Sequence, residues 1–144
     1  MNIAVIFGGR SDEHEVSRSS AVNVIKGLDS DRYEITKIGI TKEGRWYQTE
    51  AATDEIASGE WENRADNKQV CLPADPTIHG ILVFDDEERA AVKHIDCIIP
   101  VMHGDNGEDG TIQGLFELAE IPYVGPGVKA SANCMDKSFT KIIV

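Results

Sequence analysis

The stretch IAVIFGGRSDEHEVS, residues 3–17, decides the fold class of this chain. Its first five residues are continuously apolar and are ended by Gly8 and Gly9, a pattern that predicts a short strand buried on both faces. Apolar residues then recur at helical spacing, which predicts a helix from about residue 17 to residue 28. A buried strand that leads through glycines into a helix is typical of an α/β protein.

The same alternation continues along the 144 residues, enough for one domain with a real core. Further strand-like segments are expected at residues 32–41, 42–48, 79–84, 94–102 and 121–127. Two more helical segments are expected, one with Ile112, Leu115, Phe116 and Ala119 on its apolar face and one over residues 128–144. Residues 50–75 are polar and are interpreted as an insertion with one helical turn. The order predicts a parallel, Rossmann-like α/β sheet.

Composition excludes several classes of partner. The chain has 25 acidic and 14 basic residues and a net charge of −11, which argues against a nucleic-acid partner because phosphate contacts need clustered Lys and Arg. No apolar run approaches the ~20 residues that span a bilayer, and the N-terminus does not read as a signal peptide. We therefore expect a cytoplasmic protein without a membrane partner.

The three cysteines, Cys71, Cys97 and Cys134, are odd in number and form no C-x-x-C pair. Neither a disulfide framework nor a zinc site is expected, and three buried thiols in a reducing compartment fit the pattern better. None of the four histidines sits at ligand spacing from a cysteine, so we assign no metal-binding residue.

A second stretch, PVMHGDNGEDG at residues 100–110, also runs from an apolar strand into glycines and carboxylates around a histidine. In parallel sheets ligands gather beyond the carboxyl ends of the strands, so the two loops should be neighbours at that edge. A calcium loop starting at Asp105 fails, because Gly107 takes its third position and Phe116 its twelfth. The first loop matches neither the dinucleotide-binding nor the P-loop spacing, and no nucleophile elbow occurs.

Several polar residues at this edge have a structural role available as helix caps. Ser11 and Asp12 are ordinary N-cap residues for the first helix, and Asp109 resembles the cap of the second. Glu13 and His103 instead follow strand ends and are expected to point where a ligand would lie. A carboxylate suits recognition of a cation such as an ammonium group, and a histidine, which can carry a proton near neutral pH, could face an anionic partner.

Three segments, IAVIFGGRSDEHEVS, PVMHGDNGEDGTIQGLFELAEIPYVGPG and ASANCMDKSFTK, resemble successive signatures of the N-terminal region of the D-alanine–D-alanine ligase family. Their order and spacing also match, and only the acidic middle of the chain, at about residues 50–90, falls outside the resemblance. That long middle segment and KEGRWYQ are similar to the larger ligases of the group, including the vancomycin-resistance enzymes that attach D-serine or D-lactate.

The resemblance implies a pre-ATP-grasp domain at residues 1–126 and connecting helices at 127–144 that lead into an ATP-grasp central domain. In this family ATP phosphorylates the carboxylate of the first D-alanine, and the amine of the second attacks the acyl phosphate to give a peptidoglycan precursor. ATP and Mg²⁺ (or Mn²⁺) are then expected to be bound mostly by parts of the enzyme beyond Val144. The partners implied are D-alanine, with D-alanine, D-serine or D-lactate second, and another copy of the enzyme in a homodimer.

Three residues take roles from the resemblance. Glu13 matches the first acid of the family's E-x-E-V-S motif, which makes it the expected catalytic and substrate-binding anchor for the ammonium of the first D-alanine. His103 matches the histidine of H-G-x-x-G-E-D-G and is expected near the substrate carboxylates. Lys137, in MDK, matches a lysine that reaches the ATP phosphates.

Two other interpretations remain open. One is a standalone α/β module that binds an amino acid or an acidic ligand, and the other is a different ATP-grasp ligase with the same N-terminal topology. The last apolar residues are still in helical register without a C-terminal cap, which predicts a piece of a longer enzyme that is inactive alone.

Overall fold

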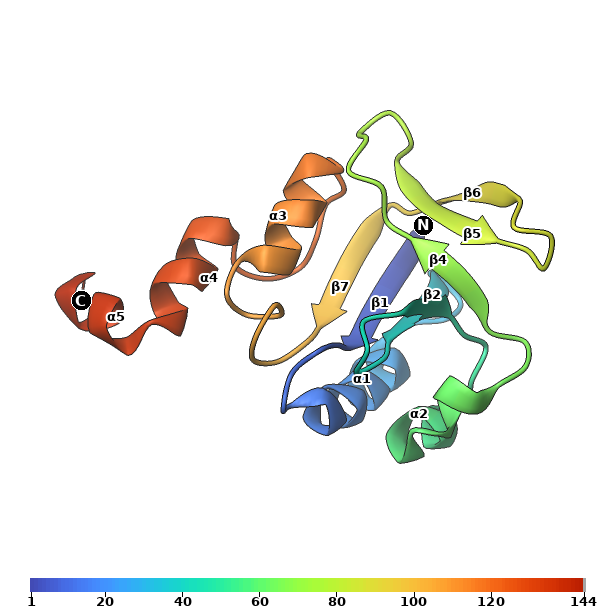
Figure 1. Ribbon diagram of the computed structural model, residues 1–144, viewed down its shortest axis with the longest axis horizontal. Coiled ribbons are helices and arrows are strands. Elements are labelled where there is room, and N and C mark those ends of the chain that lie inside the picture. The colour runs from blue at the N-terminus through green and yellow to red at the C-terminus, as the bar shows by residue number, and fades with distance from the viewer. Residues whose placement is uncertain (144) are drawn as a thin grey trace.

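A single sheet forms the centre of the molecule in the computed structural model, which describes residues 1–143. Among these residues seven strands are ordered β6-β5-β4-β3-β2-β1-β7 (Figure 1). The strands are β1 (Asn2–Gly8), β2 (Glu34–Ile40), β3 (Trp46–Gln48), β4 (Lys68–Cys71), β5 (Gly80–Phe84), β6 (Ala90–His94) and β7 (Cys97–Val101).

The α/β class is confirmed, but the sheet is mixed rather than wholly parallel. β1 pairs in parallel with β2 on one side and with β7 on the other, whereas the strands from β3 to β6 all pair antiparallel. Two of these four antiparallel pairings follow from short connections: Thr41 and Arg45 close a tight turn between β2 and β3, and Asp85 and Arg89 close another between β5 and β6. A tight turn reverses the chain and can only join antiparallel strands.

The helices are α1 (His14–Gly27), α2 (Thr53–Ser58), the 3₁₀ helix η1 (Glu60–Asn63), α3 (Thr111–Leu118), α4 (Val128–Met135) and α5 (Lys137–Ile143). Figure 1 shows α1 and α2 on one side of the sheet, α3 on the other, and α4 and α5 extending away from it. Helix α1 begins three residues before the predicted start, because its first turn buries polar residues, His14 and Ser17, that hydrophobic periodicity does not register.

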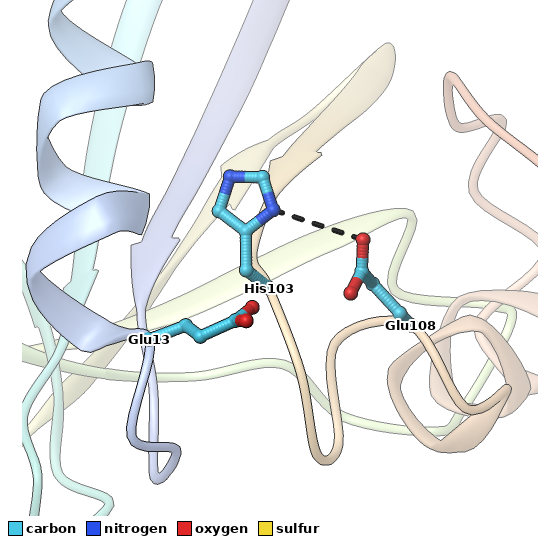
Figure 2. Close-up of side chains that lie close together, drawn as sticks. All are labelled: Glu13, His103 and Glu108. Atoms are coloured by element: carbon cyan, nitrogen blue, oxygen red, sulfur yellow. Dashed lines mark ion pairs between the residues drawn. The ribbon is translucent and has the colours of Figure 1, made fainter. Parts of the chain in front are cut away.

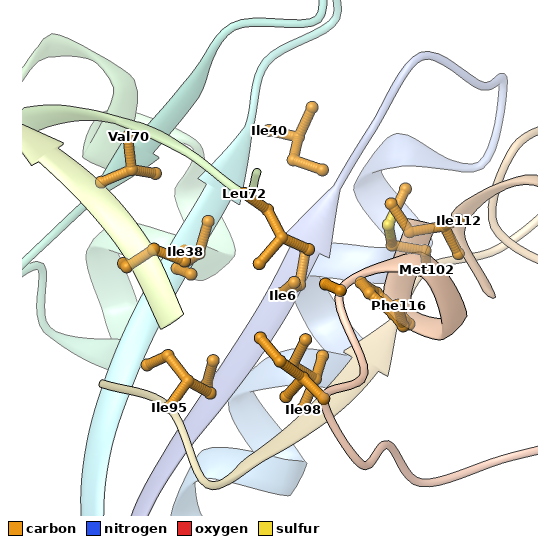
Figure 3. Packing of buried hydrophobic residues seen from close by; sticks show 14 residues of the cluster. Ile6, Ile38, Ile40, Val70, Leu72, Ile95, Ile98, Met102, Ile112 and Phe116 are labelled. Carbon is orange, nitrogen blue, oxygen red and sulfur yellow. The ribbon is translucent and has the colours of Figure 1, made fainter. Parts of the chain in front are cut away.

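The alternating faces of β1 build two cores, as its continuous apolar pattern predicted. Ala4 and Ile6 pack with the α3 residues Ile112 and Phe116 on one face (Figure 3). Val5 and its alternate neighbour Phe7 pack on the other face, against α1, α2 and η1. The edge that carries the two glycine-rich loops is thus anchored by a strand held from both sides.

Residues 50–75 hold more structure than the single helical turn that was predicted. They form α2, η1 and β4, because Ile56 and Trp61 are fully buried and anchor the segment to the sheet. The Trp61 ring meets Phe7 edge-on, with 5.2 Å between ring centroids. Gly39 permits this contact, since a Cβ atom there would lie 2.3 Å from the indole.

Other differences from the sequence expectations are local. Residues 121–127 form one parallel bridge, between Tyr123 and Ile98, instead of a short strand, and β6 was not anticipated because most of its side chains are exposed. The expected helical stretch at 128–144 is divided at Asp136, and its last residue, Val144, lies outside the described residues.

The expectation of three buried thiols is wrong. Cys71 and Cys134 are exposed and Cys97 is half-buried, although all three are free. Cys71 lies on β4, where Val70 is the buried residue, and Cys134 lies on α4, where Ser131 is the buried residue, so neither thiol is on the covered face of its element. Burial raises the pKa of the Cys97 thiol. Over residues 1–143 no helix combines the length and apolar character needed to cross a bilayer.

Candidate functional site

The two glycine-rich loops meet at one edge of the sheet, as predicted. β1 and β7 are parallel neighbours, so the loops that follow them leave at the same end. The Ser11 hydroxyl donates a hydrogen bond to the His103 carbonyl oxygen at 2.8 Å. Deeper, the fully buried Ser17 hydroxyl accepts from the Gly8 N–H at 2.7 Å and donates to the Val101 carbonyl oxygen. Two serine hydroxyls thus fix the loops relative to each other.

Glu13 lies at the N-cap position of α1, but its side chain does not cap the helix. The predicted cap was Ser11 or Asp12; Ser11 Oγ accepts the Glu13 N–H at 3.2 Å, whereas Asp12 is exposed and makes no hydrogen bond within residues 1–143. The capping role expected of Asp12 is therefore wrong, because the helix begins one residue later. The Glu13 carboxylate is exposed and remains available to a ligand.

His103 lies two residues beyond the end of β7, and Figure 2 shows its ring beside the carboxylates of Glu13 and Glu108. Its Nε2 lies 3.1 Å from the Ser20 hydroxyl of α1, and its Nδ1 lies 3.7 Å from Glu108 Oε1. The other Glu108 oxygen accepts the Gly104 N–H at 2.9 Å, which orients that carboxylate. One ligating atom from each of Glu13, His103 and Glu108 lies within 4.8 Å of the others.

Glu108 was not singled out in the sequence, although it stands in the same loop as His103. Only the fold of the loop brings it back over the histidine: Gly104 and Asn106 take positive φ angles of 69° and 66°. Asp109 steadies this turn by accepting the N–H groups of Asn106 and Thr111 at 2.9 Å each. Asp109 thus accepts a hydrogen bond from the first turn of α3, as predicted, although it precedes the N-cap residue Gly110 by one position.

The pKa of Asp109 reflects these contacts. Partial burial raises the pKa, but the backbone hydrogen bonds from Thr111 and Asn106 outweigh burial, so the pKa lies below its ordinary value. The carboxylate is therefore charged whenever the loop is in this conformation near neutral pH.

His14, the first residue of α1, is a further buried residue that the sequence did not indicate. It is 1% exposed, with Nδ1 2.9 Å from the Gly9 carbonyl oxygen and Nε2 3.4 Å from Glu62 Oε1. Since Glu62 belongs to η1, this contact links the inserted segment to the turn that precedes Glu13. In the sequence His14 stands within the acidic run DEHE, and such a run is typical of an exposed segment.

A cavity of about 560 Å³ adjoins this cluster, between the end of β7 and helix α4. His103 and Glu108 lie on its wall, together with apolar residues of β7 and α4. Two further lining residues, Gln113 and Ser131, are buried, and their Oε1 and Oγ atoms have no hydrogen-bond partner within residues 1–143.

Lys137 is not part of this cluster. It is the exposed first residue of α5, where it lines a separate surface hollow with Asp109 and Asp136. The arrangement at the sheet edge, two carboxylates beside one imidazole, suits a bound cation such as an ammonium group. These three side chains can position a ligand, but they include no serine or cysteine nucleophile.

A model of one protein family, described as the D-ala D-ala ligase N-terminus, matches residues 2–126. A D-alanine–D-alanine ligase of Thermoanaerobacter pseudethanolicus is 51% identical over 141 residues, which are 98% of this chain and 38% of that protein. The chain thus spans well under half the length of the relatives it matches.

Solved structures give the same likeness. The VanG D-Ala:D-Ser ligase of Enterococcus faecalis has a TM-score of 0.88 at 40% identity, over 96% of this chain and 39% of that one. The D-alanine–D-alanine ligase of Bacillus anthracis complexed with ATP has a TM-score of 0.59 at 29% identity, over 99% of this chain and 35% of that one.

Proposed function

The chain belongs to the family of D-alanine–D-alanine ligase N-termini, and from this premise we propose that it is the substrate-binding N-terminal part of an ATP-dependent, ADP-forming D-alanine–D-alanine ligase. The observation that carries the proposal is the cluster of Glu13, His103 and Glu108, which gathers within 4.8 Å at the carboxyl ends of β1 and β7. A cytoplasmic enzyme that makes the dipeptide for peptidoglycan precursors fits the family.

In this proposal Glu13 holds the ammonium group of the first D-alanine. The residue is suited to that task because its carboxylate is exposed and does not cap α1. His103, oriented by the Ser20 hydroxyl, lies beside it and faces the substrate carboxylate. A fixed ammonium contact orients the amino acid, so that its carboxylate is presented for phosphorylation and then for attack by the second substrate.

ATP supplies the phosphoryl group, and Lys137 is the residue of this chain that would contact its phosphates. The fit is partial: Lys137 is exposed and lines the same hollow as Asp109 and Asp136, whose carboxylates would repel a triphosphate. We therefore place most of the ATP and Mg²⁺ (or Mn²⁺) ligands in the part of these longer ligases that the chain does not cover. Residues 1–126 are then the pre-ATP-grasp domain and 127–144 the connection to the ATP-grasp domain.

The second substrate is D-alanine in the first instance, with D-serine or D-lactate as alternatives. The likeness to VanG, whose name records a D-Ala:D-Ser ligase, favours keeping D-serine among them. A homodimer is proposed from the family alone. A standalone amino-acid-binding module is the competing function, and it predicts D-alanine binding without any ligase activity.

Glu13→Gln tests the proposal in the ligase that contains this chain, because it keeps the shape and removes the charge. A charge-assisted hydrogen bond is worth about a tenfold to hundredfold change in affinity, so the KM for the first D-alanine should rise by roughly that factor while the KM for ATP stays nearly unchanged.

Asp12→Asn is the matched control, since Asp12 lies in the same turn and makes no hydrogen bond within the described chain. Glu15→Gln is a second control, although it also removes an exposed ion pair with Lys42. Equal small effects at all three positions would remove the anchor role from Glu13 and leave His103 as the remaining candidate contact.

A further inference from the structure

The cavity beside His103 and Glu108 is not used by the proposed handling of D-alanine. It lies between the end of β7 and helix α4 and measures about 560 Å³, which is within the usual range for sites that bind small organic molecules. From its walls and its unpaired polar atoms, we propose that this cavity binds an apolar primary amine that carries a second hydrogen-bond donor.

Apolar side chains form most of the cavity wall. Val101 is the last residue of β7 and Met102 follows it, Val24 comes from α1, and Ala130 comes from α4. A hydrocarbon or aromatic group placed among them would lose contact with water, which favours an occupant with an apolar body.

Two buried polar atoms define where the occupant must donate or accept. Gln113 is 4% exposed, and its Nε2 already donates to the Gly107 carbonyl oxygen at 2.8 Å, so its amide oxygen is the atom left without a partner. Ser131 is 3% exposed, and its hydroxyl is likewise unpartnered within the described chain. Buried polar groups are normally paired, and the Gln113 oxygen can only accept. A ligand N–H or O–H would pair it.

The charge at the rim selects an amine over an acid. Glu108 lies on the cavity wall and the Glu13 carboxylate lies within 4.8 Å of the Glu108 and His103 ligating atoms, on a chain with a net charge of −11. An ammonium group can donate hydrogen bonds to these carboxylates, whereas a ligand whose only charge is negative would be repelled. This ammonium end rests on the proposed function, because it uses the same acidic cluster; the cavity behind it does not.

D-phenylalaninamide is a suitable probe, since it has an ammonium group, an amide N–H donor and an aromatic body. Two comparison molecules each remove one feature: D-alaninamide lacks the aromatic ring, and N-acetyl-D-phenylalaninamide lacks the ammonium group. We expect the probe to bind the chain roughly tenfold or more tightly than either, because burial of the ring and the charged contact both contribute. NMR titration should shift the amide signals of Gly107, Gln113 and Ser131.

Ala130→Leu and Ala132→Leu separate the cavity from the rest of α4. Both alanines are exposed on that helix, but only Ala130 lines the cavity. The Ala130 variant should lose most of the probe affinity and keep that for D-alaninamide, whereas the Ala132 variant should bind both as the parent does. Heteronuclear spectra of each variant confirm that α4 is intact.

Each outcome supports or overturns the proposal. If the probe binds no more tightly than D-alaninamide, or if both leucine variants bind it equally, the cavity is not a ligand site and the proposed function is untouched. If instead Ala130→Leu abolishes probe binding while Glu13→Gln leaves the ligase unaffected, the cavity stands and the D-alanine anchor fails.

Discussion

Ser11 Oγ donates a hydrogen bond to the His103 carbonyl oxygen at 2.8 Å across a sequence separation of 92 residues. The same hydroxyl accepts the Glu13 N–H at 3.2 Å, so one side chain touches the backbone of both proposed substrate-binding residues. The spacing between Glu13 and His103 therefore depends on a loop-to-loop contact as well as on the pairing of β1 with β7.

Ser11→Ala removes this contact. The expected loss is about 1 kcal/mol in the free energy of unfolding, as for a typical partly buried hydrogen bond, measured by urea denaturation. D-alanine affinity should fall as well, because the two loops lose their direct link. Ser19→Ala is the control, since its hydroxyl bonds only the Glu15 carbonyl oxygen within α1. Identical curves and affinities for both variants would show that Ser11 does not hold the loops together.

Ile112→Asp should unfold the domain. Ile112 is 7% exposed and packs with Phe116 in the larger core, so a carboxylate there would lack both water and a partner, at a cost of about 4 kcal/mol or more. Val16→Asp makes the matched change at a site of α1 that is 53% exposed, and it should melt close to the parent. A thermal melt of Ile112→Asp that matches the parent would contradict the packing of α3.

Asp109 makes the stability of the second loop depend on pH. Because its pKa is lower when folded than when unfolded, its contribution is present above the unfolded value of about 4 and is lost as the pH falls through the folded pKa. Asp109→Asn keeps one acceptor oxygen of the two, so it should be less stable than the parent at pH 7.

The difference in the free energy of unfolding between the parent and Asp109→Asn should shrink as the pH is lowered towards about 2.5. Urea midpoints at pH 7, 4 and 2.5 measure the difference, and an NMR titration of the Asp109 carboxyl carbon measures the pKa directly. A constant difference at all three values would show that the folded loop does not stabilise the charged form.

Mg-ATP should bind the chain weakly, with a Kd above about 1 mM, because Lys137 is the one proposed phosphate contact and it lines the same hollow as Asp109 and Asp136. Calorimetric titration checks this, and Lys137→Ala should change the heat little. Micromolar affinity would mean that residues 1–144 hold more of the nucleotide site than Lys137.

The sequence by itself determined the α/β class, the buried strand at residues 3–7 and the edge of the sheet at which the two glycine-rich loops meet. These follow from local rules: continuous apolar runs, helical periodicity, and the shared direction of parallel strands. Glu13 and His103 could be chosen for the same reason, since each lies in the loop that follows one of these two parallel strands.

Only the tertiary structure decided what surrounds those two residues. Glu108 lies beside His103 because Gly104 and Asn106 take positive φ angles. His14 contacts Glu62 of the inserted segment, which is polar in sequence but buries Trp61 in the core. The first contact depends on unusual backbone angles and the second joins residues far apart in the sequence. Neither kind of contact can be predicted from hydrophobic periodicity. The order of the antiparallel strands and the unpaired Gln113 oxygen likewise depend on how the whole chain packs, because strand neighbours and burial involve residues that lie far away in the sequence.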